Sequence, residues 1–179
     1  MRSESHSDLT DEYAAVRKEM ESVAEYLGKS VLREVDEDEF MKNIADIRSS
    51  CGDRAVLRAM HFYGDNARVE KQAAALKAGD FETFKKYIIE SGRSSYMYNQ
   101  NVYSCKKASE QPVSLALSLS EKLLDGCGAW RVHGGGFAGT IQAFVPLNKL
   151  DEYKDLMEKV FGSGSCYILS VRPVGGVEL

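Results

Sequence analysis

The chain has 179 residues, a formal net charge of −4, 44% hydrophobic residues and 28% charged residues. This length suits one well-packed domain and hardly two, and the composition is that of an ordinary soluble globular protein. Lysine and arginine are spread along the sequence, which disfavours a nucleic-acid or anionic-membrane surface. No apolar run approaches the roughly 18 residues of a membrane span, and residues 1–13 lack the apolar core of a signal peptide.

The four cysteines form no Cys-x-x-Cys pair, and together with three scattered histidines they make no zinc pattern. We therefore expect no metal site and a reduced, cytoplasmic protein with structural thiols. The cysteines are Cys51, Cys105, Cys127 and Cys166.

The first quarter of the sequence shows helical periodicity. An apolar stripe predicts a helix over residues 10–27, with acidic residues near its N-terminal end and Gly28 after its last turn. A short extended piece is expected over residues 31–35. The acidic residues 36–39 then start a small helix, whose inward positions are Phe40, Ile44 and Ile47.

A longer helix is predicted over residues 54–78, for which Asp53 is a candidate cap. The sequence Gly64-Asp65-Asn66 threatens to kink or break this helix. The periodicity resumes after it and stops at Gly79, so both halves are expected to be helical.

The middle of the chain contains two more predicted helices. Asp80 is expected to cap a helix over residues 80–91, and Pro112 occupies the first-turn position of a helix over residues 112–124. The residues between them, 91–111, are polar and rich in tyrosine, and are expected to form a long connection.

The last third of the sequence changes to strand patterns. Residues 129–133 and 140–145 are expected to form a hairpin, and residues 166–172 alternate as a further strand. Asn148, with an aspartate three residues later, resembles a capping box for a helix over residues 148–161. Helices first and strands later predict an α+β domain, a two-layer sandwich with an antiparallel sheet and helices mainly on one face.

The most informative motif joins the two hairpin strands. Four glycines, Gly134, Gly135, Gly136 and Gly139, lie within six residues. Glycine is favoured where the backbone takes a positive φ or where another group approaches too closely for a Cβ atom. The loop is therefore either pressed against a ligand or a neighbouring loop, or a hairpin that needs glycine for its geometry alone. It does not have the Gly-x-Gly-x-x-Gly pattern and opens no helix, so it is not a dinucleotide-binding fingerprint.

Other polar motifs favour structural roles. The Gly28-Lys29-Ser30 sequence lacks the earlier glycine of a phosphate-binding loop and is interpreted as a helix stop. The sequence Gly92-Arg93-Ser94-Ser95 is interpreted as a polar helix end rather than a phosphate site, and His133 as a surface residue rather than a ligand-facing one. No Ser/His/Asp or Cys/His set can be assembled. Surface or capping roles are assigned to Glu12, Glu70 and Asp80.

Three segments together resemble the galactokinases, members of the small-molecule kinase family that also contains homoserine, mevalonate and phosphomevalonate kinases. Residues 5–13, followed by Arg17, are similar to the stretch in which a tyrosine contacts the sugar. Residues 66–81 and 90–95 resemble the family's long helix and the helix after it. Residues 126–140 resemble its third conserved motif, typically Arg-Met-Thr-Gly-Gly-Gly-Phe-Gly-Gly.

The chain also departs from the galactokinase pattern. The family's N-terminal Arg, Glu, His and Asp set, its Gly-Leu-Ser-Ser-Ser phosphate loop and its catalytic aspartate are not present, so the resemblance is to the C-terminal domain only. Val132-His133 replaces Met-Thr, Ala138 replaces a glycine and is expected to restrict the turn, and Gly92 stands where a histidine is common.

The resemblance implies a fold and a function. It implies that residues 1–179 form one domain of the GHMP kinase C-terminal type, ferredoxin-like, from an enzyme that phosphorylates the 1-hydroxyl of D-galactose with ATP and Mg²⁺. Tyr13 would contact a sugar hydroxyl, although the apolar stripe also gives it a core role. The cleft would be bordered by Gly134, Gly135, Gly136, Phe137 and Gly139.

The same resemblance leaves two hypotheses open for the chain alone. One is an inactive C-terminal part of a galactokinase, without catalytic residues, ATP or Mg²⁺ of its own and separated from its N-terminal domain. The other is a non-catalytic sugar-sensing or interaction module derived from a galactokinase. In either case exposed apolar surface and an open strand edge favour a homodimer of the chain.

Overall fold

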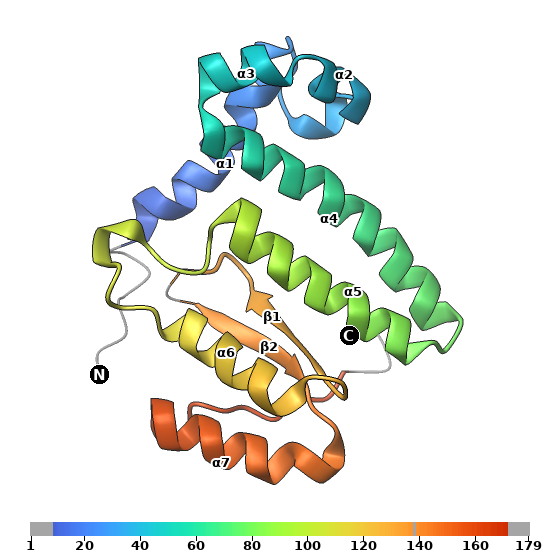
Figure 1. Cartoon of the computed structure of the whole chain (residues 1–179), viewed down its shortest axis with the longest axis vertical. Helices are drawn as coiled ribbons and strands as arrows, with labels where there is room; N and C mark the ends of the chain where they lie inside the picture. The colour runs from blue at the N-terminus through green and yellow to red at the C-terminus, as the bar shows by residue number, and fades with distance from the viewer. Residues whose placement is uncertain (1–8, 138, 172–179) are drawn as a thin grey trace, which may run out of the picture. The chain divides into compact units, whose positions relative to one another are not determined.

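The computed structural model describes residues 9–137 and 139–171, so Ala138 and the sequence motif at residues 5–8 lie outside the described residues. The chain divides into two compact units, Met1–Phe144 and Val145–Leu179. The described part of the first unit contains most of the helices and the hairpin (Figure 1).

The elements of the first unit follow the predicted order. Its α-helices are α1 (Thr10–Tyr26), α2 (Glu37–Lys42), α3 (Ile44–Cys51), α4 (Asp53–Lys77), α5 (Phe81–Ser94) and α6 (Pro112–Leu124). Its short turns are η2 (Leu32–Glu34), η3 (Ser95–Asn99) and η4 (Cys105–Lys107), and its strands are β1 (Ala129–His133) and β2 (Thr140–Phe144). The predicted helices over 10–27, 54–78, 80–91 and 112–124 are confirmed, with shifts of a few residues at their ends.

An apolar cluster packs α1 against α2, α3 and the first half of α4. Val23 and Ala24 come from α1, Phe40 from α2, Ile47 from α3 and Ala59 from α4, and all five are buried. Burial of these apolar groups is the main favourable term that holds the four helices together.

Three local predictions in this region are wrong. Residues 31–35 are not one extended piece, because Leu32–Glu34 form a 3₁₀ turn between extended Val31 and Val35. The small helix is two helices, α2 and α3, that meet at Asn43. Gly52 precedes the first turn of α4, and Asp53 lies inside that turn, where it pairs with Arg48 instead of capping.

The sequence also indicated a kink or break at Gly64, but α4 runs without interruption from Asp53 to Lys77. Asp65 accepts hydrogen bonds from Arg68 Nε at 3.0 Å and from the Ser91 hydroxyl at 2.6 Å. These contacts fix the helix just after Gly64, both to its own next turn and to α5. Tertiary contacts therefore outweigh the low helix propensity of glycine.

The hairpin packs against α5 and α6. β1 and β2 are antiparallel, with Ala129 opposite Phe144 and Val132 opposite Ile141. Gly92 of α5 lies against β1, where a Cβ atom would stand 3.0 Å from the Arg131 Cβ. The glycine at this position lets the helix and the strand approach closely.

The described part of the second unit consists of η5 (Leu147–Lys149), α7 (Leu150–Phe161) and an irregular segment after it. The predicted helix over 148–161 is confirmed, but the capping box is not, since Lys149 precedes α7 and no side chain caps it. The strand predicted over 166–172 is also wrong for residues 166–171, which form no strand; Arg172 lies outside the described residues. The described sheet thus has two antiparallel strands, and the fold is mostly helical and compatible with α+β.

Candidate functional site

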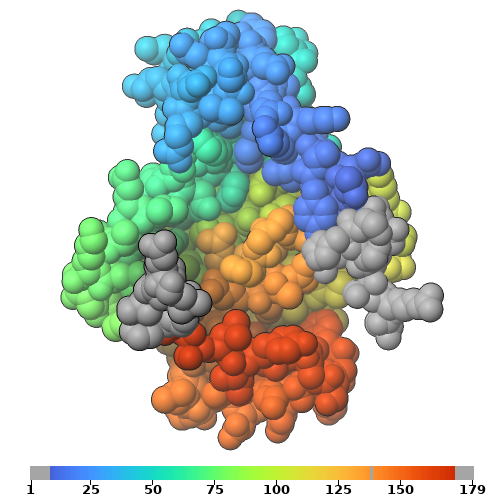
Figure 2. All heavy atoms as spheres, turned by 180° about the vertical axis from the view of Figure 1, so that it is seen from behind, coloured from blue at the N-terminus to red at the C-terminus, as the bar shows by residue number. Residues whose placement is uncertain are grey.

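The glycine turn, residues 134–139 between β1 and β2, meets the start of α1. The Tyr13 hydroxyl donates a hydrogen bond to the Gly136 carbonyl oxygen at 2.9 Å, across 123 residues of sequence. The Tyr13 ring also stands edge-on to the Phe137 ring, with 5.2 Å between the centroids. Figure 2 shows α1 in blue beside the orange hairpin on one face of the unit. The structure therefore brings together two candidate regions that the sequence placed far apart.

Close contacts explain two of the glycines. A Cβ atom on Gly135 would stand 2.7 Å from Tyr13 Cε1. A Cβ atom on Gly136 would collide with the Asn101 carbonyl oxygen, and Gly136 has a φ of +83°. Both positions exclude any larger residue without a rearrangement. Of the two interpretations of the loop, the structure thus supports a turn pressed against its neighbours.

Asn101 holds the turn from the other side. Its backbone carbonyl accepts a hydrogen bond from the Phe137 N–H at 2.6 Å, and its side-chain Nδ2 donates to the Gly135 carbonyl at 3.3 Å. Phe137 is 4% exposed and has a φ of +53°, an uncommon value for a residue that is not glycine. The Gly139 N–H closes the turn by donating to the Gly136 carbonyl at 2.9 Å. The turn is therefore fixed by contacts from both Tyr13 and Asn101.

Asn101 belongs to a segment that continues α5, which we call the strap (residues 95–101). It begins with the π-helical turn η3 and passes through Gln100, which has a left-handed conformation with a φ of 54°. Single π-helical turns often occur at functional sites. The sequence predicted only a long connection here, so the strap is the main feature that it missed.

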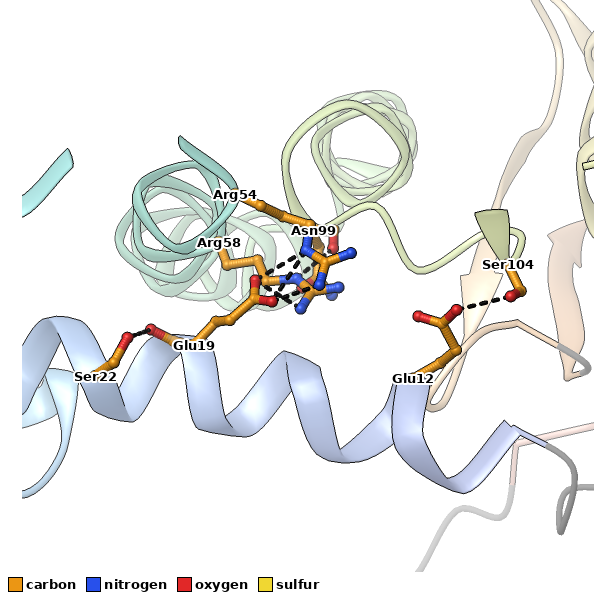
Figure 3. A network of polar contacts seen from close by, with 7 residues as sticks. All are labelled: Glu12, Glu19, Ser22, Arg54, Arg58, Asn99 and Ser104. Carbon is orange, nitrogen blue, oxygen red and sulfur yellow. Dashed lines mark hydrogen bonds and ion pairs between the residues drawn. The ribbon is translucent and has the colours of Figure 1, made fainter. Parts of the chain in front are cut away.

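A buried arginine connects the strap to α1 and α4 (Figure 3). Arg58 of α4 is fully buried; its Nε donates to the Asn99 carbonyl at 3.0 Å, and its Nη1 lies 2.9 Å from Glu19 Oε2 of α1. Arg54 adds a second guanidinium to the same carboxylate. Burial lowers the pKa of the Arg58 guanidinium, and the charge of Glu19 opposes that shift.

A second polar contact joins the start of α1 to the residues after the strap. The Ser104 hydroxyl donates to Glu12 Oε1 at 2.7 Å, as Figure 3 shows. Glu12 therefore accepts a hydrogen bond from a buried serine, whereas the sequence predicted only a surface or capping role for it. Together with Tyr13, it gives the first turn of α1 two specific contacts.

The other candidate residues have structural contacts. Asp80 caps α5 by accepting from the Thr83 N–H at 3.0 Å, as predicted, and Glu70 and His133 are exposed. Two side chains of the Gly92–Ser95 sequence already have partners within the protein. Arg93 pairs with Glu121, and the Ser94 hydroxyl lies 2.9 Å from His61 Nδ1. A phosphate role for this sequence is therefore not favoured. As predicted for the Gly28-Lys29-Ser30 sequence, helix α1 ends just before Gly28, which has a φ of +72°.

A groove of about 640 Å³ runs along α1 beside the glycine turn. Tyr13 and Gly135 lie at one end of it, and Val31 and Phe62 line it farther along. This volume is in the range of small-molecule sites. Across the described ranges 9–137 and 139–171, no group of three His, Cys, Asp or Glu residues could hold a metal ion, and no helix is long and apolar enough to cross a membrane.

Comparison with known proteins identifies relatives of the chain. It is 32% identical over 174 residues to the galactokinase of Homo sapiens. This alignment covers 97% of this chain and 41% of the human protein. It is 31% identical over 164 residues to the galactokinase of Bos taurus and 26% identical over 152 residues to that of Mannheimia succiniciproducens. No protein-family model matches the chain.

The matches cover 85–97% of this chain but only 37–41% of those three relatives. The chain thus spans about two fifths of the length of the curated relatives that it matches. The resemblance that the sequence motifs indicated, to the C-terminal part of a galactokinase, is confirmed.

Proposed function

Because the chain is homologous to part of the galactokinases, we propose that it forms the C-terminal part of such an enzyme. The intact enzyme would transfer the γ-phosphate of ATP to the 1-hydroxyl of D-galactose. We further propose that residues 1–179 act as one domain of the GHMP kinase C-terminal type, with a ferredoxin-like arrangement, in a cytoplasmic enzyme.

The observation that carries the proposal is the contact between Tyr13 and the glycine turn. The sequence resemblance assigns Tyr13 to the sugar and the glycine turn to the border of the cleft, and the Tyr13 hydroxyl lies 2.9 Å from the Gly136 carbonyl oxygen. A phenol oxygen that donates one hydrogen bond can also accept one from a sugar hydroxyl. Residues with related roles are thus grouped at one end of the groove.

The proposed role of this chain in the reaction is to position the sugar. Phosphoryl transfer depends mainly on positioning and on neutralising the charge of the phosphates. Among the described residues, no group of three His, Cys, Asp or Glu side chains could hold a metal ion. We assign the binding of ATP and Mg²⁺ to the N-terminal domain of the intact enzyme, and we expect the isolated chain to be inactive.

A chimeric enzyme tests the proposal. The stretch of human galactokinase that matches this chain is replaced by it, and ADP release is measured with ATP, Mg²⁺ and galactose. We expect galactose-dependent turnover in the chimera and none from the isolated chain. Tyr13→Phe should lower kcat/KM for galactose about three- to tenfold, because one hydrogen bond is lost.

The outcomes of this experiment separate the two hypotheses. A folded chimera that binds galactose but shows no turnover would favour a non-catalytic sugar-sensing module. Galactose-dependent turnover by the isolated chain, well above a buffer blank, would contradict the assignment of ATP and Mg²⁺ binding to the N-terminal domain. An unchanged kcat/KM in Tyr13→Phe would remove the sugar contact from Tyr13.

We also propose that the isolated chain self-associates. In the second unit, Tyr167, Leu169 and Val171 are each at least 80% exposed, and apolar side chains in such numbers favour association. Light scattering over a dilution series should give the mass of a dimer at high concentration. A mass of one chain at every concentration would rule the dimer out.

A further inference from the structure

Two residues that line the groove each carry a buried side-chain oxygen atom that has no hydrogen-bond partner. These atoms are the side-chain Oδ1 atoms of Asn99 and Asn101, two residues that are 7% and 3% exposed. Both residues line the groove beside α1. Native proteins rarely leave a buried polar atom unpaired, and those that remain call for an explanation.

The orientation of Asn101 is fixed by its neighbour. Its Nδ2 donates to the Gly135 carbonyl oxygen. Exchanging the oxygen and nitrogen of this amide would place two acceptors against each other. The Asn101 Oδ1 is therefore an acceptor by necessity, and a partner for it must donate a hydrogen bond.

The charges along the groove limit the chemistry of that partner. The lining residue Glu21 is paired with Arg17 at 2.6 Å, and Arg33 lies over the Phe62 ring with 5.9 Å to its centroid. A cationic ligand would be repelled by Arg33. An anionic group can only accept hydrogen bonds, so it cannot satisfy two acceptor oxygens. A neutral ligand with several donors and an apolar face suits both the two oxygens and the apolar lining.

Hydroxyl groups meet the requirement better than a nucleobase does. Hydroxyl hydrogens rotate toward an acceptor, whereas the ring nitrogens of a base would place acceptors against the asparagine oxygens. A pyranose also has an apolar C–H face. These features together describe a carbohydrate.

We propose that Asn99 and Asn101 accept hydrogen bonds from the hydroxyl groups of a neutral sugar bound at the end of the groove next to Tyr13. This inference rests on the proposed function, to which it adds two contacts from the strap. It assigns the strap a part in sugar binding, in addition to holding the glycine turn.

Titration of the isotope-labelled chain with D-galactose, followed by NMR, tests the inference. We expect saturable shifts for Tyr13, Gly135 and the side-chain amide of Asn99. Asn99→Leu removes one unpaired oxygen and should weaken galactose binding about three- to tenfold, a factor set by one hydrogen bond. The same variant should be as stable as the parent or more so, because no hydrogen bond of that oxygen is lost.

A matched control is Asn148→Leu, since Asn148 is exposed in η5 and does not line the groove. It should leave galactose affinity unchanged. Saturable binding that Asn99→Leu does not weaken would overturn the role of the strap while leaving sugar binding, and thus the proposed function, in place. No saturable shift in the parent chain would overturn the inference as well, whereas the chimeric enzyme would still report on the proposed function.

Discussion

The apolar cluster and the glycine turn lie at opposite ends of α1 and are held by different forces. The cluster around Phe40 and Ile47 depends on the burial of apolar surface, which has no preferred direction. The turn depends on a few atoms at fixed positions, such as the Gly136 and Asn101 carbonyl oxygens. The loss of side-chain volume should therefore destabilise the cluster, whereas a single added methyl group should destabilise the turn.

The largest effect is expected in the cluster. Phe40 is fully buried, and Phe40→Ala should lower the free energy of unfolding by about 3–5 kcal/mol through lost burial and the cavity left behind. Urea denaturation measures the loss. Phe81→Ala is the control, because Phe81 is 64% exposed and its removal should change stability by no more than about 0.5 kcal/mol. Equal losses in the two variants would contradict the importance of the cluster.

The next effect should be found in the turn. Gly136→Ala places a methyl group against the Asn101 carbonyl at a positive φ, and should cost about 3 kcal/mol. Gly134→Ala is the matched control, since Gly134 has a φ of +67° and a methyl group added there would meet no atom within 4 Å. It should cost only about 1 kcal/mol. Similar losses would show that backbone conformation, not contact with the strap, decides the role of these glycines.

A smaller effect is expected where α1 meets the turn. Tyr13→Phe removes the hydroxyl that binds the Gly136 carbonyl, while Gly139 still donates to the same oxygen. The loss of stability should therefore be about 1 kcal/mol. Tyr26→Phe, on an exposed tyrosine of the same helix, should leave the thermal midpoint unchanged. A Tyr13→Phe variant as stable as the parent would show that this hydroxyl does not support the turn.

The difference between the two regions also explains what the sequence could predict. The cluster follows from the apolar stripe of α1 and the pattern around Phe40, because burial leaves a periodic trace. The hairpin and its glycines are predictable as well, and family resemblance links Tyr13 to a cleft. The partner of Gly136 is not predictable, since Asn101 lies in a polar stretch without periodicity.

Two wrong predictions have the same physical origin. Local signals indicated a kink or break at Gly64 and a strand over residues 166–172, but the outcome at each place depends on partners that the local pattern does not reveal. At Gly64, Asp65 is bound by Arg68 and Ser91, which keeps the helix continuous. At residues 166–171, alternation alone does not make a strand, because a strand needs a neighbour with which to pair.

The smallest expected effect concerns His61, a buried side chain that, like the glycine turn, is held by specific polar contacts. His61 of α4 is buried, with Ser94 at 2.9 Å from Nδ1 and Asp65 at 4.0 Å from Nε2. Burial lowers its pKa below the ordinary value of 6.5; Asp65 opposes that shift, and the positive charges of Arg68 and Arg131 add to it. The folded chain therefore takes up the His61 proton at a lower pH than the unfolded chain does.

Stability should consequently depend on pH in one direction. Well above pH 6.5, His61 is neutral in both states and has no effect on stability. As the pH falls below that value, the unfolded chain binds the proton first, so the free energy of unfolding decreases until the folded pKa is reached. Urea denaturation at a series of pH values should show a shallower decrease for His61→Gln than for the parent. A His61→Gln curve that coincides with the parent curve would mean that the buried histidine does not contribute to the pH dependence.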